Sequence, residues 1–73
     1  MKKLTTKEWI AITEQVTSLM AQHRLRMGQA YMNALNSIKP ELYKEITQME
    51  SIDPFYKDKN LPAFFEYLTD KKL

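Results

Sequence analysis

Apolar residues recur every three or four positions along most of this chain, and no stretch alternates apolar and polar residues as a strand does. Such spacings place side chains on one face of an α-helix. The clearest series comprises Trp9, Ile12, Val16, Leu19, His23 and Met27. The chain is therefore predicted to be all-α, a small single-domain bundle of about four helices with an irregular segment before the last helix.

Capping signals predict where the first two helices begin and end. Thr5 is followed three residues later by Glu8, which fits a capping box, so the first helix should begin near Thr5 or Thr6. We expect it to end near residues 22–24. A second helix should run from about Leu25 to Ile38, either separate from the first or joined to it by a kink.

Prolines predict the later boundaries. Pro40 cannot continue the preceding helix but suits the first turn of a new one, which should end near Glu50. Residues 51–60 lack a helical pattern and form the irregular segment. Asn60 can cap a last helix that has Pro62 in its first turn.

A chain of 73 residues lies near the lower size limit for a core without disulfides or metals. We expect one domain, 1–73, with frayed ends at 1–4 and 70–73. Glycine inside a helix costs about 1 kcal/mol relative to alanine, so Gly28 should lie where a larger side chain would collide with a neighbouring element. The predicted core is Trp9, Ile12, Val16, Leu19, Tyr31, Leu35, Leu42, Ile46, Phe64, Phe65 and Leu68.

Composition argues against several classes of function. The chain has no cysteine and one histidine, so a thiolate zinc site is excluded. That histidine, His23, belongs to the apolar series and is expected at the edge of the core. Glu41 and Glu45 share a helix face, as paired catalytic carboxylates can, but no other residue converges on them. We therefore expect no catalytic activity, no cofactor and no metal.

Charge and hydropathy bear on location and partners. The net charge of +2 is low for a protein that binds nucleic acid chiefly through phosphates. No apolar run approaches the length of a membrane span, and the basic start is not followed by the apolar segment of a signal peptide. We expect a cytoplasmic protein without membrane contact.

Four polar side chains lie along one side of the second expected helix: Arg26, Gln29, Asn33 and Asn36. Their spacing places them on one face. Three interpretations of this polar row are open. It is a solvated face, its Gln29 and Asn33 hydrogen-bond the irregular segment, or it binds a partner. Three carboxamides and an arginine are an unusual composition for a solvated face, which keeps the last two interpretations open. Met32 lies off the main apolar stripe. Methionine is more often pliable core filling, but if Met32 is exposed beside Arg24 it would add to an interface.

The irregular segment contains Asp53-Pro54-Phe55-Tyr56. The two aromatic residues are predicted to plug the gap between the third and fourth helices. The alternative is an exposed binding site, since tyrosine and arginine are enriched in such sites. Asp53 should cap the turn or pair with Arg26.

Ordered motifs extend from Arg26 to Leu68: Arg-x-Gly-Gln-x-Tyr-x-Asn-x-Leu, Pro-x-Leu-Tyr-x-x-Ile, Asp-Pro-Phe-Tyr and Leu-Pro-Ala-Phe. In this combination the chain resembles a group of small uncharacterised proteins of bacteriophage and bacterial genomes. The matching positions are Arg26, Gly28, Gln29, Tyr31, Asn33, Leu35, Pro40, Leu42, Tyr43, Ile46, Asp53, Pro54, Phe55, Tyr56, Leu61, Pro62, Ala63 and Phe64. The resemblance implies no activity, but a phage setting favours a small protein that binds a host component in the host cytoplasm.

These features predict a non-catalytic helical interaction protein that docks on a protein partner. The residues expected to bind that partner are Arg24, Arg26, Gln29, Asn33, Asn36, Asp53, Phe55 and Tyr56. The alternative is a nucleic-acid-binding module, because arginine, glutamine and asparagine are the residue types that read base edges from a helix. It would use Arg24, Arg26, Gln29 and Asn33. The near-heptad apolar row of the first helix also allows a homodimer.

Overall fold

Four α-helices and one short 3₁₀ helix make up the protein in a computed structural model that describes residues 4–69. The elements are α1 (Thr6–His23), α2 (Met27–Ile38), α3 (Pro40–Thr47), η1 (Asp58–Asn60) and α4 (Leu61–Thr69). No strand occurs among the described residues, so the all-α prediction is confirmed. Within the same residues, no helix is both long enough and apolar enough to cross a membrane.

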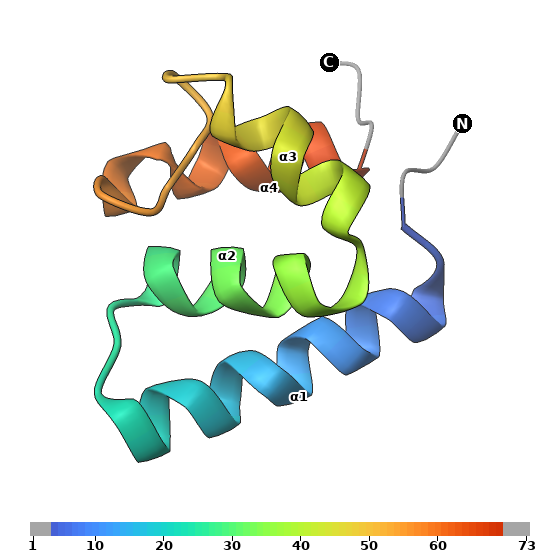
Figure 1. Ribbon diagram of the computed structural model, residues 1–73, viewed down its shortest axis with the longest axis vertical. Coiled ribbons are helices and arrows are strands. Elements are labelled where there is room, and N and C mark those ends of the chain that lie inside the picture. The colour runs from blue at the N-terminus through green and yellow to red at the C-terminus, as the bar shows by residue number, and fades with distance from the viewer. Residues whose placement is uncertain (1–3, 70–73) are drawn as a thin grey trace.

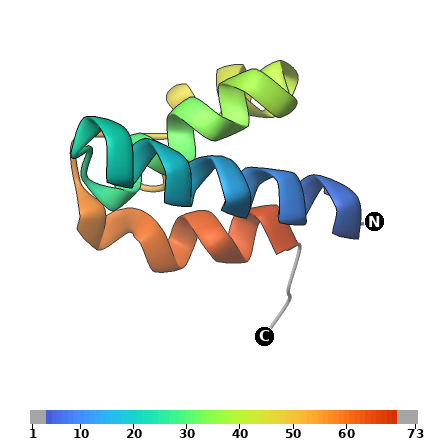
Figure 2. The ribbon, with the colours of Figure 1, turned by 90° about the horizontal axis from the view of Figure 1, so that it is seen from below.

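Helix α2 lies at the centre of the fold. α1 runs antiparallel to α2 on one side, and α3 and α4 lie on the other side (Figure 1). The view from below separates the last two helices, with α3 toward the top, α4 toward the bottom and α1 in front between them (Figure 2). α4 also reaches α1, since the ring centroids of Trp9 and Phe65 are 6.4 Å apart. All four helices therefore contribute to one core.

Both ends of α1 agree with the sequence. The N–H of Glu8 donates to Thr5 Oγ1 (3.1 Å) and the N–H of Thr5 donates to Glu8 Oε1 (2.8 Å), which is the predicted capping box. α1 ends at His23, because Arg24 adopts a left-handed conformation with φ 54°. Residues 24–26 are not helical. α1 and α2 are therefore separate helices, and α2 begins two residues later than predicted.

The end of α3 differs from the prediction. Pro40 opens the helix as expected, but α3 ends at Thr47 and not near Glu50. The backbone turns there, because the N–H groups of Ile52 and Asp53 both donate to the Met49 carbonyl oxygen at 2.9 Å. The irregular segment is accordingly longer than the sequence suggests.

Asn60 acts on the irregular segment and not in the expected way on the last helix. Its side-chain amide donates to the carbonyl oxygens of Glu50 (3.0 Å) and Asp53 (2.9 Å). The turn of η1 leads directly into α4, which has Pro62 in its first turn as predicted. Asn60 therefore holds residues 50 and 53 against the start of α4.

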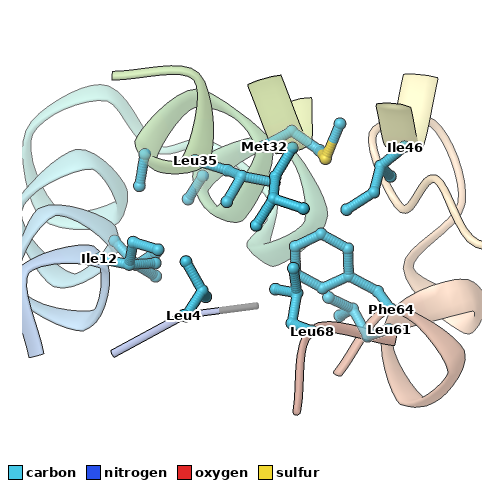
Figure 3. Close-up of a cluster of buried hydrophobic side chains, with 12 residues drawn as sticks. Leu4, Ile12, Met32, Leu35, Ile46, Leu61, Phe64 and Leu68 are labelled. Atoms are coloured by element: carbon cyan, nitrogen blue, oxygen red, sulfur yellow. The ribbon is translucent and has the colours of Figure 1, made fainter. Parts of the chain in front are cut away.

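Every residue of the predicted core is buried or packs half-buried against the core. Figure 3 shows the central cluster, to which Leu4 and side chains of all four helices contribute. Leu4 is 2% exposed, so the prediction of a frayed 1–4 end is wrong at this position. The rest of the expected frayed ends, residues 1–3 and 70–73, lies outside the described residues.

Two further residues, His23 and Met27, depart from their predicted environments, whereas Met32 has the core-filling role that is more common for methionine. His23 is exposed and Met27 is 42% exposed, because the chain leaves α1 at His23 and the α1 face does not continue into Met27. Met32 is 0% exposed, because α2 packs against α1 on one side and against α3 and α4 on the other. Met32 therefore belongs to the core and cannot add to an exposed interface.

Candidate docking surface

A loop between α3 and α4, residues 53–58, is bound to the first turn of α2. We name it the Pro54 loop. Arg26 Nη2 donates to the Phe55 carbonyl oxygen (3.3 Å), and the Gly28 N–H donates to Asp58 Oδ1 (3.1 Å). These bonds join positions 29 and 30 residues apart in the sequence. They fasten a segment without regular structure to the central helix.

Gly28 is the point of closest approach between α2 and the Pro54 loop. Gly28 is buried, and a Cβ atom there would collide with the Pro54 carbonyl oxygen and lie 2.8 Å from Asp58 Oδ1. The prediction of close packing at Gly28 is therefore confirmed, and the neighbouring element is this loop. A glycine that is unfavourable for the helix is required by the tertiary contact.

The Pro54 loop is also held by its own residues. The Phe55 N–H donates to Asp53 Oδ1 (2.9 Å), and the Lys57 N–H donates to the Pro54 carbonyl oxygen (3.2 Å). Asp53 thus caps the turn, one of its two predicted roles. The other role, pairing with Arg26, is wrong, because Arg26 donates to the Phe55 carbonyl oxygen. The backbone of Phe55 is consequently bound on both sides.

The two aromatic residues of the loop have different environments. Phe55 is half-buried and packs against the core, as a plug would. Tyr56 is 77% exposed, so the prediction that both rings fill a gap is wrong for Tyr56. The two rings make an edge-to-face contact, with centroids 4.8 Å apart and planes at 71°. Phe55 therefore supports an exposed tyrosine.

The polar row of α2 is only partly solvated. Asn33 and Asn36 are exposed, whereas Gln29 is half-buried and its Oε1 accepts the Arg26 N–H (3.3 Å). Gln29 thus satisfies the first turn of its own helix. The predicted hydrogen bonds from Gln29 and Asn33 to residues 51–60 do not occur in the described part of the chain. Arg26 and the Gly28 backbone make that contact.

The fold brings some of the predicted partner-binding residues together and separates others. Arg26, Asp53, Phe55 and Tyr56 meet at the Pro54 loop. Asn36 lies about 15 Å from Arg26 along the axis of α2, given the rise per residue of an α-helix. Arg24 is exposed in the connection between α1 and α2.

A groove that the sequence does not predict runs between α3 and the Pro54 loop. One hollow, of about 320 Å³, is lined by Met32, Tyr43, Thr47, Asp53, Phe55 and Tyr56. A second, of about 430 Å³, is lined by Thr47, Gln48, Glu50, Asp53, Tyr56 and Lys57. The two hollows share Thr47, Asp53 and Tyr56, so they lie next to each other, and we name them together the α3 groove.

Five residues that line the α3 groove were not predicted as site residues: Gln48, Glu50, Lys57, Tyr43 and Thr47. Tyr43 and Thr47 both line the smaller hollow, and Tyr43 is half-buried. The available signal was their spacing of four residues, which places both on one face of α3. The path of the loop opposite them was not foreseeable. No cluster of acidic, histidine or cysteine residues among residues 4–69 is arranged to hold a metal ion.

A shifted pKa is found away from the α3 groove, at Glu8 in the first turn of α1. The backbone N–H of Thr5 lowers the pKa of Glu8, and Lys39, whose Nζ is 3.6 Å from Glu8 Oε2, lowers it further.

The chain matches no family model, no curated protein and no solved structure. The function is therefore argued from the geometry of the Pro54 loop, the polar row and the α3 groove.

Proposed function

We propose that this chain is a non-catalytic helical interaction protein that docks on another protein. The docking surface is formed by the Pro54 loop and by Arg26, Gln29 and Asn33 of the polar row. One observation carries the proposal: Tyr56 is 77% exposed although the loop that bears it is tied to α2 and to the Asn60 side chain of η1. A large apolar ring in a fixed position facing solvent is a typical feature of binding surfaces.

The attachment of the loop favours binding energetically. Ordering one residue of a flexible loop on binding costs about 1–2 kcal/mol of backbone entropy. The bonds from Arg26 and Gly28 already fix the Pro54 loop in the folded chain. Tyr56 can then bury its ring with little further loss, and a preorganised surface binds more tightly than a flexible one.

The neighbouring polar groups suit recognition of a protein surface. Arg26 uses one guanidinium nitrogen for the Phe55 carbonyl oxygen, and its remaining N–H groups are available to a partner. Asn33 is exposed on the same face of α2 and offers both a donor and an acceptor. The resemblance to phage and bacterial proteins favours a host or phage macromolecule in a bacterial cytoplasm as the partner.

The test compares what three versions of the chain capture from a bacterial lysate. These are the wild type, Tyr56→Ser and Ile10→Ser. Ile10 is 54% exposed on α1, so Ile10→Ser removes an exposed apolar side chain from a different surface. We expect a protein that the wild type and Ile10→Ser retain and Tyr56→Ser loses. Equal capture by all three chains would contradict the proposal.

Nuclease treatment of the lysate separates the nucleic-acid alternative. Capture through nucleic acid would disappear with nuclease, would depend on Arg24, Arg26, Gln29 and Asn33, and would be indifferent to Tyr56→Ser. That result would replace the proposal with a nucleic-acid-binding module. We expect nuclease to have no effect, since Glu50 and Asp53 line the groove beside Tyr56 and carboxylates repel phosphates.

A further inference from the structure

The α3 groove combines aromatic walls with a carboxylate. Tyr43, Phe55 and Tyr56 contribute three rings to its smaller hollow, and Asp53 contributes the acidic group. Asp53 Oδ1 accepts the Phe55 N–H, which fixes the orientation of the carboxylate. No basic side chain of residues 4–69 pairs with it. The carboxylate therefore retains acceptor capacity toward a ligand in the groove.

The local charge of the groove has the opposite sign to that of the chain. The chain carries a net charge of +2. The groove is lined by two carboxylates, Asp53 and Glu50, and by one basic residue, Lys57. Arg26, the cation of the polar row, donates to the Phe55 carbonyl oxygen and does not line either hollow.

We propose that the α3 groove receives an arginine side chain of the protein partner. Its guanidinium would lie against the rings of Tyr43 and Tyr56 and pair with the Asp53 carboxylate. This inference rests on the proposed function, because it names the chemistry of the partner at the same surface. Aromatic faces attract cations, and the flat guanidinium also stacks on them, which an ammonium group does not.

Other occupants fit these observations less well. An apolar side chain would remove water from Asp53 without giving the carboxylate a partner, which is unfavourable. An anionic group would be repelled by Asp53 and Glu50. The two hollows, of about 320 and 430 Å³, both lie in the lower part of the range for small-molecule sites, a size that one long side chain fills.

The test is a titration of the intact chain, followed by NMR amide shifts, with two probes. The first probe is N-acetyl-arginine methylamide, and the second is N-acetyl-citrulline methylamide, which has the same length and planarity but no charge. We expect saturable shifts of the groove residues with the arginine probe. The citrulline probe should bind at least about fivefold more weakly. Equal binding of both probes, or shifts outside the groove, would overturn the proposal.

Matched variants identify the charged group. Asp53→Asn keeps a side-chain oxygen that accepts the Phe55 N–H, so the turn is retained while the charge is removed. We expect it to weaken binding of the arginine probe about fivefold. Glu14→Gln removes an equal charge at an exposed position of α1 and should leave binding unchanged. If Asp53→Asn fails to fold, Glu50→Gln takes its place, with about a twofold expected loss because Glu50 lines only the larger hollow. Equal affinities of the groove variant and Glu14→Gln would overturn the proposal.

The two proposals fail in different ways. If Tyr56→Ser loses the captured protein and Asp53→Asn retains it at full affinity, the docking surface stands and the arginine pocket is wrong. If the arginine probe binds the groove but no captured protein depends on Tyr56, the groove binds arginine, but the docking surface is wrong and a partner's arginine is not its occupant.

Discussion

Replacing Gly28 by alanine should destabilise the protein, although alanine is the better helix former. In a helix without tertiary contacts the exchange stabilises by up to about 1 kcal/mol. At Gly28 the added methyl group would collide with the Pro54 carbonyl oxygen and lie 2.8 Å from Asp58 Oδ1. Both neighbours belong to the Pro54 loop, so the loop has to move away from α2.

The size of the effect follows from what the displaced loop loses. The bond from the Gly28 N–H to the Asp58 carboxylate is of a kind worth about 1.5–3 kcal/mol. Forcing extra atoms into a packed contact costs about 1–3 kcal/mol if the contact does not open. Allowing for the gain in helix propensity, we expect the free energy of unfolding to fall by about 1–3 kcal/mol.

The assay is urea unfolding followed by far-UV circular dichroism, with linear extrapolation to water. The control pair is Asn33→Gly and Asn33→Ala, at an exposed position of the same helix. There the alanine variant should be about 1 kcal/mol more stable than the glycine variant. A Gly28→Ala variant as stable as the wild type would contradict the close contact between α2 and the Pro54 loop, as would a normal melting temperature for the larger Gly28→Leu.

Three further predictions concern the core, the irregular segment and pH. Met32→Ala should lower the free energy of unfolding by about 2–5 kcal/mol, measured by thermal unfolding, because Met32 is 0% exposed. Met27→Ala, at a position that is 42% exposed, should change it by less than about 0.5 kcal/mol. Equal effects of the two substitutions would contradict their different environments. Asn60→Ala removes two hydrogen bonds to backbone carbonyls and should lose about 1–3 kcal/mol in urea unfolding, so an unchanged midpoint would be inconsistent with them. The Thr5 N–H and Lys39 hold the pKa of Glu8 below its usual value of 4.5. In this pH range the folded chain therefore binds fewer protons than the unfolded chain. The stability that ionised Glu8 contributes is present above pH 4.5 and is lost as the pH falls below it. The stability difference between wild type and Glu8→Gln should therefore shrink on acidification, and a difference independent of pH would argue against this role.

The parts of the fold that sequence reasoning predicted correctly are those with local signals. The capping box of α1 lies within four consecutive residues, Thr5 to Glu8. Pro40 marks the start of α3 by its own covalent structure. The core positions were recognised because apolar residues at helical spacing have to be buried against another element.

The Pro54 loop could not be predicted, because its path is set by contacts between distant residues. The bonds from Arg26 to Phe55 and from Gly28 to Asp58 span almost the whole of α2 and α3. Phe55 and Tyr56 are adjacent and chemically similar, and only the tertiary structure places one against the core and the other in solvent. Gly28 was an exception, since a residue unfavourable for its helix indicated a contact before the partner was known.

The position of Met32 shows a related limit of helical patterns. A single apolar stripe predicts a helix that packs on one side. α2 packs against neighbours on two sides, so its buried arc is wider than that stripe and includes Met32. The number of neighbours of a helix is a property of the whole fold and is not encoded in its own spacing.

The proposed docking surface requires that the loop bearing Tyr56 is fixed before any partner binds. The most direct test is ¹⁵N relaxation of the Phe55 and Tyr56 amides in the free protein. We predict order parameters of about 0.85, equal to those of the rigid helices. Values below about 0.6 at these two amides would show a flexible loop and would contradict the claim.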